Sequence, residues 1–143
     1  MRKVAWLTAV LNAAGFAALG AALFAAKTST WVPALAILFT SVAVQLAFVG
    51  GVQAGAGIAS QRGGRGPVVA LLLGWLLSLG ALAVPWLRST GQQAAWAVAL
   101  LAVSFAIDAW VVRRGLLPRW FLALRAVSTV AILVATALAF VRA

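Results

Sequence analysis

The sequence predicts an all-α, polytopic membrane protein in which five transmembrane helices form an up-down bundle. Of its 143 residues, 66% are hydrophobic and 8% are charged, whereas soluble domains average about a quarter charged residues. The apolar residues gather into five stretches of about 20 residues, the length that crosses a hydrocarbon core of roughly 30 Å. Because the connections between these stretches are short, consecutive helices are expected to be antiparallel neighbours.

The five stretches make up a single domain over residues 1–143, with predicted spans at 4–26, 33–59, 67–87, 94–112 and 120–141. The first follows Arg2 and Lys3, as the apolar core of a signal peptide would. It is longer than the usual core of about 7–15 residues, however, and it lacks a convincing A-x-A cleavage site. We therefore expect it to be a membrane helix.

Prolines and basic loops delimit the remaining spans. Pro33, Pro67 and Pro118 stand at or just before span starts, where a missing backbone N–H costs no helical hydrogen bond. Pro85 lies near the end of the third span, and the fourth ends where a basic loop begins at Arg113. None of the five segments has the alternating polarity of a β-barrel strand.

Positive charge predicts the orientation, because loops rich in Lys and Arg remain in the cytoplasm. With the N-terminus inside, the cytoplasmic side carries eight cations: Arg2, Lys3, Arg62, Arg65, Arg113, Arg114, Arg119 and Arg125. The other side carries three: Lys27, Arg88 and Arg142. Six of the seven tryptophans also fall near span ends, where their amphipathic rings prefer the headgroup region. The N-terminus is therefore predicted to be cytoplasmic and the C-terminus to lie on the opposite side.

Basic loops beside membrane spans are expected to contact anionic lipid headgroups, at about 1 kcal/mol per residue. On the predicted cytoplasmic side, the residues assigned to this contact are Arg62, Arg65, Arg113, Arg114 and Arg119. Nucleic acid is not an expected partner despite the net charge of +10, because loops this short cannot hold a binding module.

The residue inventory excludes several kinds of chemistry. The chain contains no cysteine and no histidine. Thiolate or imidazole metal sites, disulfides, haem ligation by these side chains and catalysis by Ser-His or Cys-His pairs are therefore excluded. We expect no metal, no cofactor and no enzymatic activity.

The single acidic residue, Asp108, lies inside the fourth span about one turn from its cytoplasmic end. Arg125 lies at a similar depth in the fifth span, across a short turn. A salt bridge between Asp108 and Arg125 is the expected way to avoid an isolated charge in the membrane. A proton or cation site at Asp108 is the alternative, although relays normally use several titratable groups in series.

The second span contains Gly51 and Gly55 in G-x-x-x-G spacing, which lets helix backbones approach closely. The first span repeats this spacing with alanines, and the residues predicted to pack there are Ala14, Ala18 and Ala22. Gln45 and Gln53 project within one broad face of the second span, and with Asn12 they are candidates for a polar path. Ordinary intramolecular packing is one interpretation of the glycines. A broken or kinked helix whose freed carbonyls line a small cavity is the other.

Two blocks of sequence resemble a known family. The first is AFVGGV at 47–52, and the second joins Asp108 to LPRWF at 117–121, Leu124, Arg125 and Thr129. Together they resemble a domain-of-unknown-function family of small five-span bacterial inner-membrane proteins that has a mitochondrial transmembrane relative. The resemblance implies the five-span fold, a bacterial inner (cytoplasmic) membrane and a setting near respiratory membrane complexes, but no activity, substrate or cofactor. The chain departs from the family at Gln53 and Ala54, where larger residues are usual.

Three functions remain open at this stage. The first is a non-catalytic accessory or structural subunit, or an assembly factor, that associates with other membrane subunits or with copies of itself. The second is a small oligomeric channel or transporter with a polar path near Gln45, Gln53 and Asp108. The third is a lipid-binding membrane protein that uses its basic cytoplasmic face.

Overall fold

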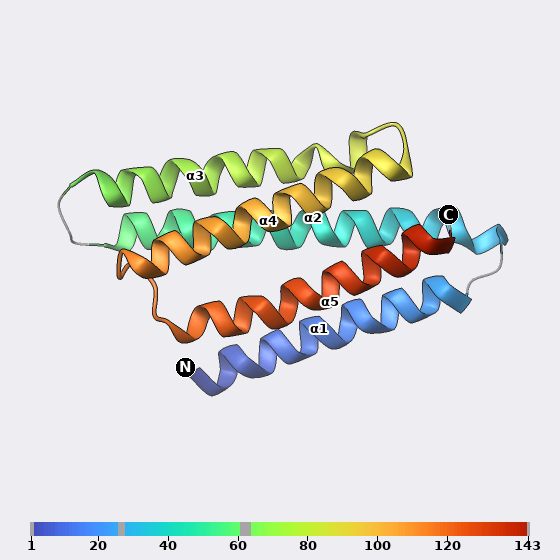
Figure 1. Ribbon diagram of the computed structural model, residues 1–143, viewed down its shortest axis with the longest axis horizontal. Coiled ribbons are helices and arrows are strands. Elements are labelled where there is room, and N and C mark those ends of the chain that lie inside the picture. The colour runs from blue at the N-terminus through green and yellow to red at the C-terminus, as the bar shows by residue number, and fades with distance from the viewer. Residues whose placement is uncertain (1, 26–27, 61–63, 143) are drawn as a thin grey trace.

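The computed structural model describes residues 2–25, 28–60 and 64–142, and within these ranges the chain is helical and contains no strand (Figure 1). The five helices are α1 (Arg2–Ala25), α2 (Thr28–Ala59), α3 (Arg65–Leu82), α4 (Thr90–Arg113) and α5 (Trp120–Arg142), with a short 3-10 turn, η1 (Val84–Trp86). The prediction of an all-α chain with five helices is confirmed. Lys27 and Arg62 lie outside the described residues.

Four of the helices are long and apolar enough to cross a bilayer, over Ala34–Ala59, Arg65–Trp86, Thr90–Arg113 and Trp120–Leu138. Helix α1 contributes a shorter apolar stretch, Ala9–Ala25, among its described side chains. The chain is thus a multi-pass helical membrane protein, and a fifth crossing by α1 stays a prediction.

The helices run side by side along one axis (Figure 1). The central helix α2 packs mainly against α3, and it also contacts α4. The first and last helices, α1 and α5, pack along each other and run in the same direction. Contacts between α1 and α2 are sparse although these helices follow one another in the chain. The short loops therefore make consecutive helices antiparallel, but consecutive helices do not all pack closely against each other.

Glycines set the closest helix contact, between α2 and α3. A Cβ atom built on Gly50 would clash with the Gly74 carbonyl oxygen and with Ser78 Oγ, so only glycine allows this approach. The Ser78 hydroxyl donates to the carbonyl oxygens of Ala47 at 3.1 Å and of Gly74 at 3.0 Å. Such close backbone packing is typical of membrane helices, where the surrounding lipid is as apolar as the side chains.

The turn between α3 and α4 departs from the predicted third span. Helix α3 ends at Leu82 and η1 follows, because Pro85 has no N–H to continue the helical hydrogen bonds. Helix α4 then starts at an N-cap, where Ser89 Oγ accepts from Gln92 N at 3.2 Å. Trp96 Nε1 donates to the Gly80 carbonyl oxygen at 3.0 Å and joins the two helices beside the turn.

The turn between α4 and α5 is set by a glycine. Gly115 adopts a positive φ of 69° just after α4. Its N–H donates to Val112 O at 2.9 Å, and Leu116 N donates to Val111 O at 3.1 Å. This is the Schellman pattern that ends a helix and satisfies its last carbonyls. The tight turn keeps the start of α5 beside the end of α4, at the depth of Asp108.

Candidate functional site

A cluster of buried polar side chains joins three helices inside the bundle. We call Gln53 from α2, Ser104 and Asp108 from α4, and Arg125 from α5 the polar cluster. At its centre, Arg125 Nε lies 2.8 Å from Asp108 Oδ2 in an ion pair. Arg125 is 3% exposed, and Asp108 is fully buried. The structure thus brings together the two charged residues that the sequence pairs.

Both carboxylate oxygens of Asp108 are engaged. Gln53 Nε2 donates to Asp108 Oδ1 at 2.7 Å and lies 3.2 Å from the Ser104 carbonyl oxygen. Arg125 Nη2 donates to Ser104 Oγ at 3.2 Å, and that hydroxyl donates to the Leu101 carbonyl oxygen at 2.8 Å. Hydrogen bonds to charged groups are about twice as strong as neutral ones. The cluster therefore ties α2, α4 and α5 together with its charges neutralised.

Local helix geometry explains how the cluster assembles. Ser104 and Asp108 are four residues apart on α4 and so lie on one face. Arg125 is in the second turn of α5, and the tight Gly115 turn holds it opposite that face. Ser104 is not part of the predicted pair, and its i, i+4 spacing from Asp108 is the signal that places it there. Gln53 joins from α2 by tertiary packing.

Three buried polar atoms near the cluster lack a hydrogen-bond partner within the described ranges: Gln53 Oε1, Arg125 Nη1 and Thr129 Oγ1. Arg125 Nη1 can donate, Gln53 Oε1 can accept, and the Thr129 hydroxyl can do both. Because the Asp108 oxygens are both occupied, the geometry favours a structural pair over a cation site at that carboxylate.

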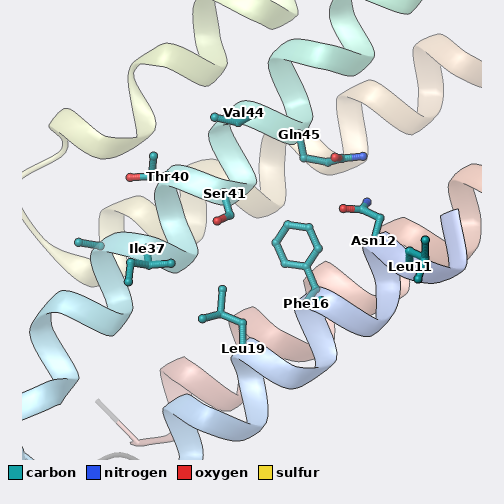
Figure 2. Close-up of a pocket in the computed structure, with 11 residues that line it drawn as sticks. Leu11, Asn12, Phe16, Leu19, Ile37, Thr40, Ser41, Val44 and Gln45 are labelled. Carbon is teal, nitrogen blue, oxygen red and sulfur yellow. The ribbon is translucent and has the colours of Figure 1, made fainter. Parts of the chain in front are cut away.

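A second polar region lies in a groove of about 730 Å³ between α1 and α2. Figure 2 shows Asn12 of α1 and Gln45 of α2 directed toward each other across it, with Phe16 between the helices. Ser41 and Thr40 also line the groove. These residues lie near the middle of both helices along their length, and on α2 they lie within the candidate span Ala34–Ala59. We call this region the α1–α2 groove.

The polar side chains of the α1–α2 groove are not paired with one another. No hydrogen bond from the side chain of Asn12, Gln45, Ser41 or Thr40 is found within the part of the chain that the structure describes. The three predicted polar-path residues are thus divided between two places: Asn12 and Gln45 line the groove, whereas Gln53 belongs to the polar cluster.

The predicted packing face of α2 is corrected by the structure. Gly51 and Gly55 are exposed, and a Cβ atom on either would meet nothing within 4 Å. The glycines that face α3 are Gly50 and Gly57, because one residue turns an α-helix by about 100°. Helix α2 is also continuous from Thr28 to Ala59, so it is not broken at its glycines.

The predicted packing face of α1 is corrected in the same way. Ala14, Ala18 and Ala22 are all exposed. The close contact of α1 is made by Gly20, where a built Cβ would lie 3.1 Å from the Ala135 Cα of α5. The small residues are thus present in the predicted helix, but those in contact with the rest of the bundle lie on a different face.

Four of the basic residues described at helix ends and in loops lie at one end of the bundle, whereas Arg88 lies in the turn between α3 and α4 at the other end. Arg65 begins α3, Arg113 ends α4, and Arg119 precedes α5, and these three helix ends lie together at the left of Figure 1. All three side chains are exposed, as is that of Arg114, whose guanidinium lies 5.5 Å from the centre of the Trp110 ring. We call these four arginines the basic end.

Comparisons with known protein families, with curated proteins and with solved structures find no match to this chain. The family resemblance of the two sequence blocks therefore stays a prediction.

Proposed function

We propose that this protein is a non-catalytic accessory or structural subunit, or an assembly factor, of a larger membrane complex. In this proposal, the α1–α2 groove receives a transmembrane helix of a partner that carries hydrogen-bonding side chains. The observation that carries the proposal is the pair of amides, Asn12 and Gln45, directed into a groove at mid-length of two apolar helices.

Acyl chains cannot satisfy these amides, since lipid tails offer neither donors nor acceptors. Each amide can donate two hydrogen bonds and accept more through its oxygen. A polar side chain on a neighbouring helix is the usual partner of such groups, at about 0.6–2 kcal/mol per interaction. A groove that leaves them without partners within the described chain is thus better suited to a helix than to lipid.

The exposed glycines of α2 support the proposal that a partner helix binds along this side of α2. Thr40, Val44, Gly51 and Gly55 recur at helical spacing along α2, and all are exposed. Gly51 and Gly55 carry no side chains, and the exposed Phe48 and Ile58 on the same face offer apolar surface to a partner helix. A partner helix that meets the amides in the groove could therefore continue along the glycines.

A small channel or transporter is the alternative that the sequence leaves open. It has less support, because its path requires Gln45, Gln53 and Asp108 to share one conduit. Gln53 and Asp108 are fully buried and bonded to each other, whereas Gln45 lines a lateral groove.

We further propose that the basic end faces the cytoplasm, so that the N-terminus is cytoplasmic and the host is a bacterial inner membrane. Support comes from the grouping of Arg65, Arg113, Arg114 and Arg119 at that end, which is the distribution expected of cytoplasmic loops.

The test is migration of the protein from native membranes solubilised in mild detergent. We expect the wild type to migrate with a larger assembly and Gln45→Leu to shift toward the free chain. Gln92→Leu is the matched control, because Gln92 is an exposed glutamine at the start of α4, outside the groove. Wild-type protein that migrates only as a free monomer would contradict the proposal.

A further inference from the structure

A separate pocket lies at the basic end, between the last turns of α2 and the turn that joins α4 to α5. Its volume is about 490 Å³, within the range of small-ligand sites. Small and apolar residues line most of it, among them Val52, Gly55, Ala56, Leu116 and Leu117. The polar exception in the lining is Ser60, whose buried hydroxyl lacks a hydrogen-bond partner within the described ranges. We call this cavity the end pocket.

Two arginines flank, in the sequence, the turn residues that line the end pocket, although neither arginine is itself a lining residue. Two lining residues, Leu116 and Leu117, lie between Arg113 and Arg119 in the sequence, and both arginines are exposed. Arg65, also exposed, begins α3 at the same end of the bundle. The chain has one acidic residue, Asp108, and it is paired inside the polar cluster. Arg65, Arg113 and Arg119 therefore have no acidic side chain of this chain to neutralise them.

We propose that the end pocket and its arginines form a binding site for one anionic phospholipid. An acyl chain would occupy the apolar pocket, and the phosphodiester headgroup would contact Arg113 and Arg119. Charge complementarity selects this ligand, because guanidinium groups bind phosphate oxygens well and a zwitterionic lipid brings no net charge. The inference uses neither Asn12 nor Gln45, but Gly55 belongs both to this pocket and to the exposed stripe of α2 described above. Arg113 and Arg119 belong to neither the stripe nor the α1–α2 groove, so the arginine variants separate the two proposals.

The structure supplies a substitution that should block the pocket without disturbing the fold. A Cβ atom on Gly55 meets nothing within 4 Å, so Gly55→Leu should fold normally and fill part of the space. Gly51→Leu is the matched control, because Gly51 is equally open but does not line the pocket. For the headgroup, Arg113→Gln/Arg119→Gln is matched by Arg88→Gln, an exposed arginine in the loop before α4.

The experiment is native mass spectrometry of the purified full-length chain, titrated with phosphatidylglycerol or phosphatidylcholine of the same acyl composition. We expect one tightly retained phosphatidylglycerol and much weaker retention of phosphatidylcholine. Gly55→Leu should weaken phosphatidylglycerol binding roughly tenfold, equivalent to the loss of about two buried methylenes. The double arginine variant should weaken it roughly 30-fold, and both controls should bind as the wild type does.

Glycerophosphate, which has the headgroup chemistry without acyl chains, distinguishes a lipid from a free phosphate. Under the proposal, glycerophosphate does not displace phosphatidylglycerol at concentrations at which phosphatidylglycerol itself saturates the site. Competition by glycerophosphate, equal retention of the two lipids, or unchanged binding by Gly55→Leu or by the double variant would each overturn the lipid site. The double arginine variant lies outside the α1–α2 groove and the exposed stripe of α2, so it should lose lipid binding while it still migrates with a larger assembly. The two proposals therefore fail separately.

Discussion

The polar cluster and the α1–α2 groove place similar side chains in opposite situations. Gln53 and Gln45 are both on α2, eight residues apart. Gln53 is fully buried and donates to Asp108 and Ser104. Gln45 is half-buried at the edge of an open groove and has no hydrogen bond within the described part of the chain.

The difference comes from the neighbours of α2. Eight residues turn a helix by about 80° beyond two full turns, enough to aim the two glutamines at different elements. Near Gln53, α4 and α5 approach and supply a carboxylate and a carbonyl. Near Gln45, α1 lies across a groove. In a membrane, a polar group satisfied within the chain supports the fold, whereas an unsatisfied one is available to a partner.

Removing a buried charge should give the largest effect on stability. We expect Arg125→Ala to lower the free energy of unfolding by roughly 3–5 kcal/mol, because it leaves Asp108 buried without its partner. Arg119→Ala, six residues earlier and exposed, should change it little. Reversible unfolding in mixed micelles measures both. If Arg125→Ala and Arg119→Ala lowered the free energy of unfolding equally, the buried ion pair would stabilise the fold no more than an exposed arginine does, and the comparison would fail.

The two glutamines test the comparison on a single helix. Gln53→Leu should lower the free energy of unfolding by roughly 1.5–3 kcal/mol, the usual value of a hydrogen bond to a charged group. Gln45→Leu should change it by no more than about 0.5 kcal/mol, as for an exposed site, while it disrupts association. The same micelle assay compares them. If Gln45→Leu proved the more destabilising, the groove would be part of the internal packing.

Two adjacent glycines of α2 allow the same comparison for helix packing, because one is buried against α3 and the other is exposed. Gly50→Ala should destabilise the fold by roughly 1–3 kcal/mol, because its new methyl group meets the backbone of Gly74 and Ser78 Oγ. Gly51→Ala has open space around it, and the better helix propensity of alanine should add about 0.5–1 kcal/mol. Thermal melts in detergent distinguish them. Similar melting temperatures would mean that α2 and α3 do not pack as closely as described.

Composition and local pattern were sufficient to predict the class of the protein and its five helices. They also predicted the pairing of Asp108 with Arg125, because an unpaired charge inside the membrane is costly and these two residues lie at a similar depth in neighbouring spans. Helix ends were less accurate where the turn chemistry was specific. The third helix is shorter than predicted because Pro85 interrupts its hydrogen bonds.

The sequence could not identify which face of a helix lies inside the bundle. In a membrane helix both the buried and the lipid-facing sides are apolar, so the hydrophobic pattern carries little directional signal. Gly50 and Gly51 are adjacent and equally small, yet one contacts α3 and the other is exposed. For the same reason, Gln53 was placed on a path with Gln45 and not in the polar cluster.

A double-mutant cycle on Asp108 and Arg125 tests most directly whether the polar cluster is structural. The free energy of unfolding is measured for the wild type, Asp108→Ala, Arg125→Ala and the double variant. We predict that the double variant loses much less than the two single losses combined, because neither charge is then left alone. Additive losses would mean that the two residues are uncoupled and would contradict the account.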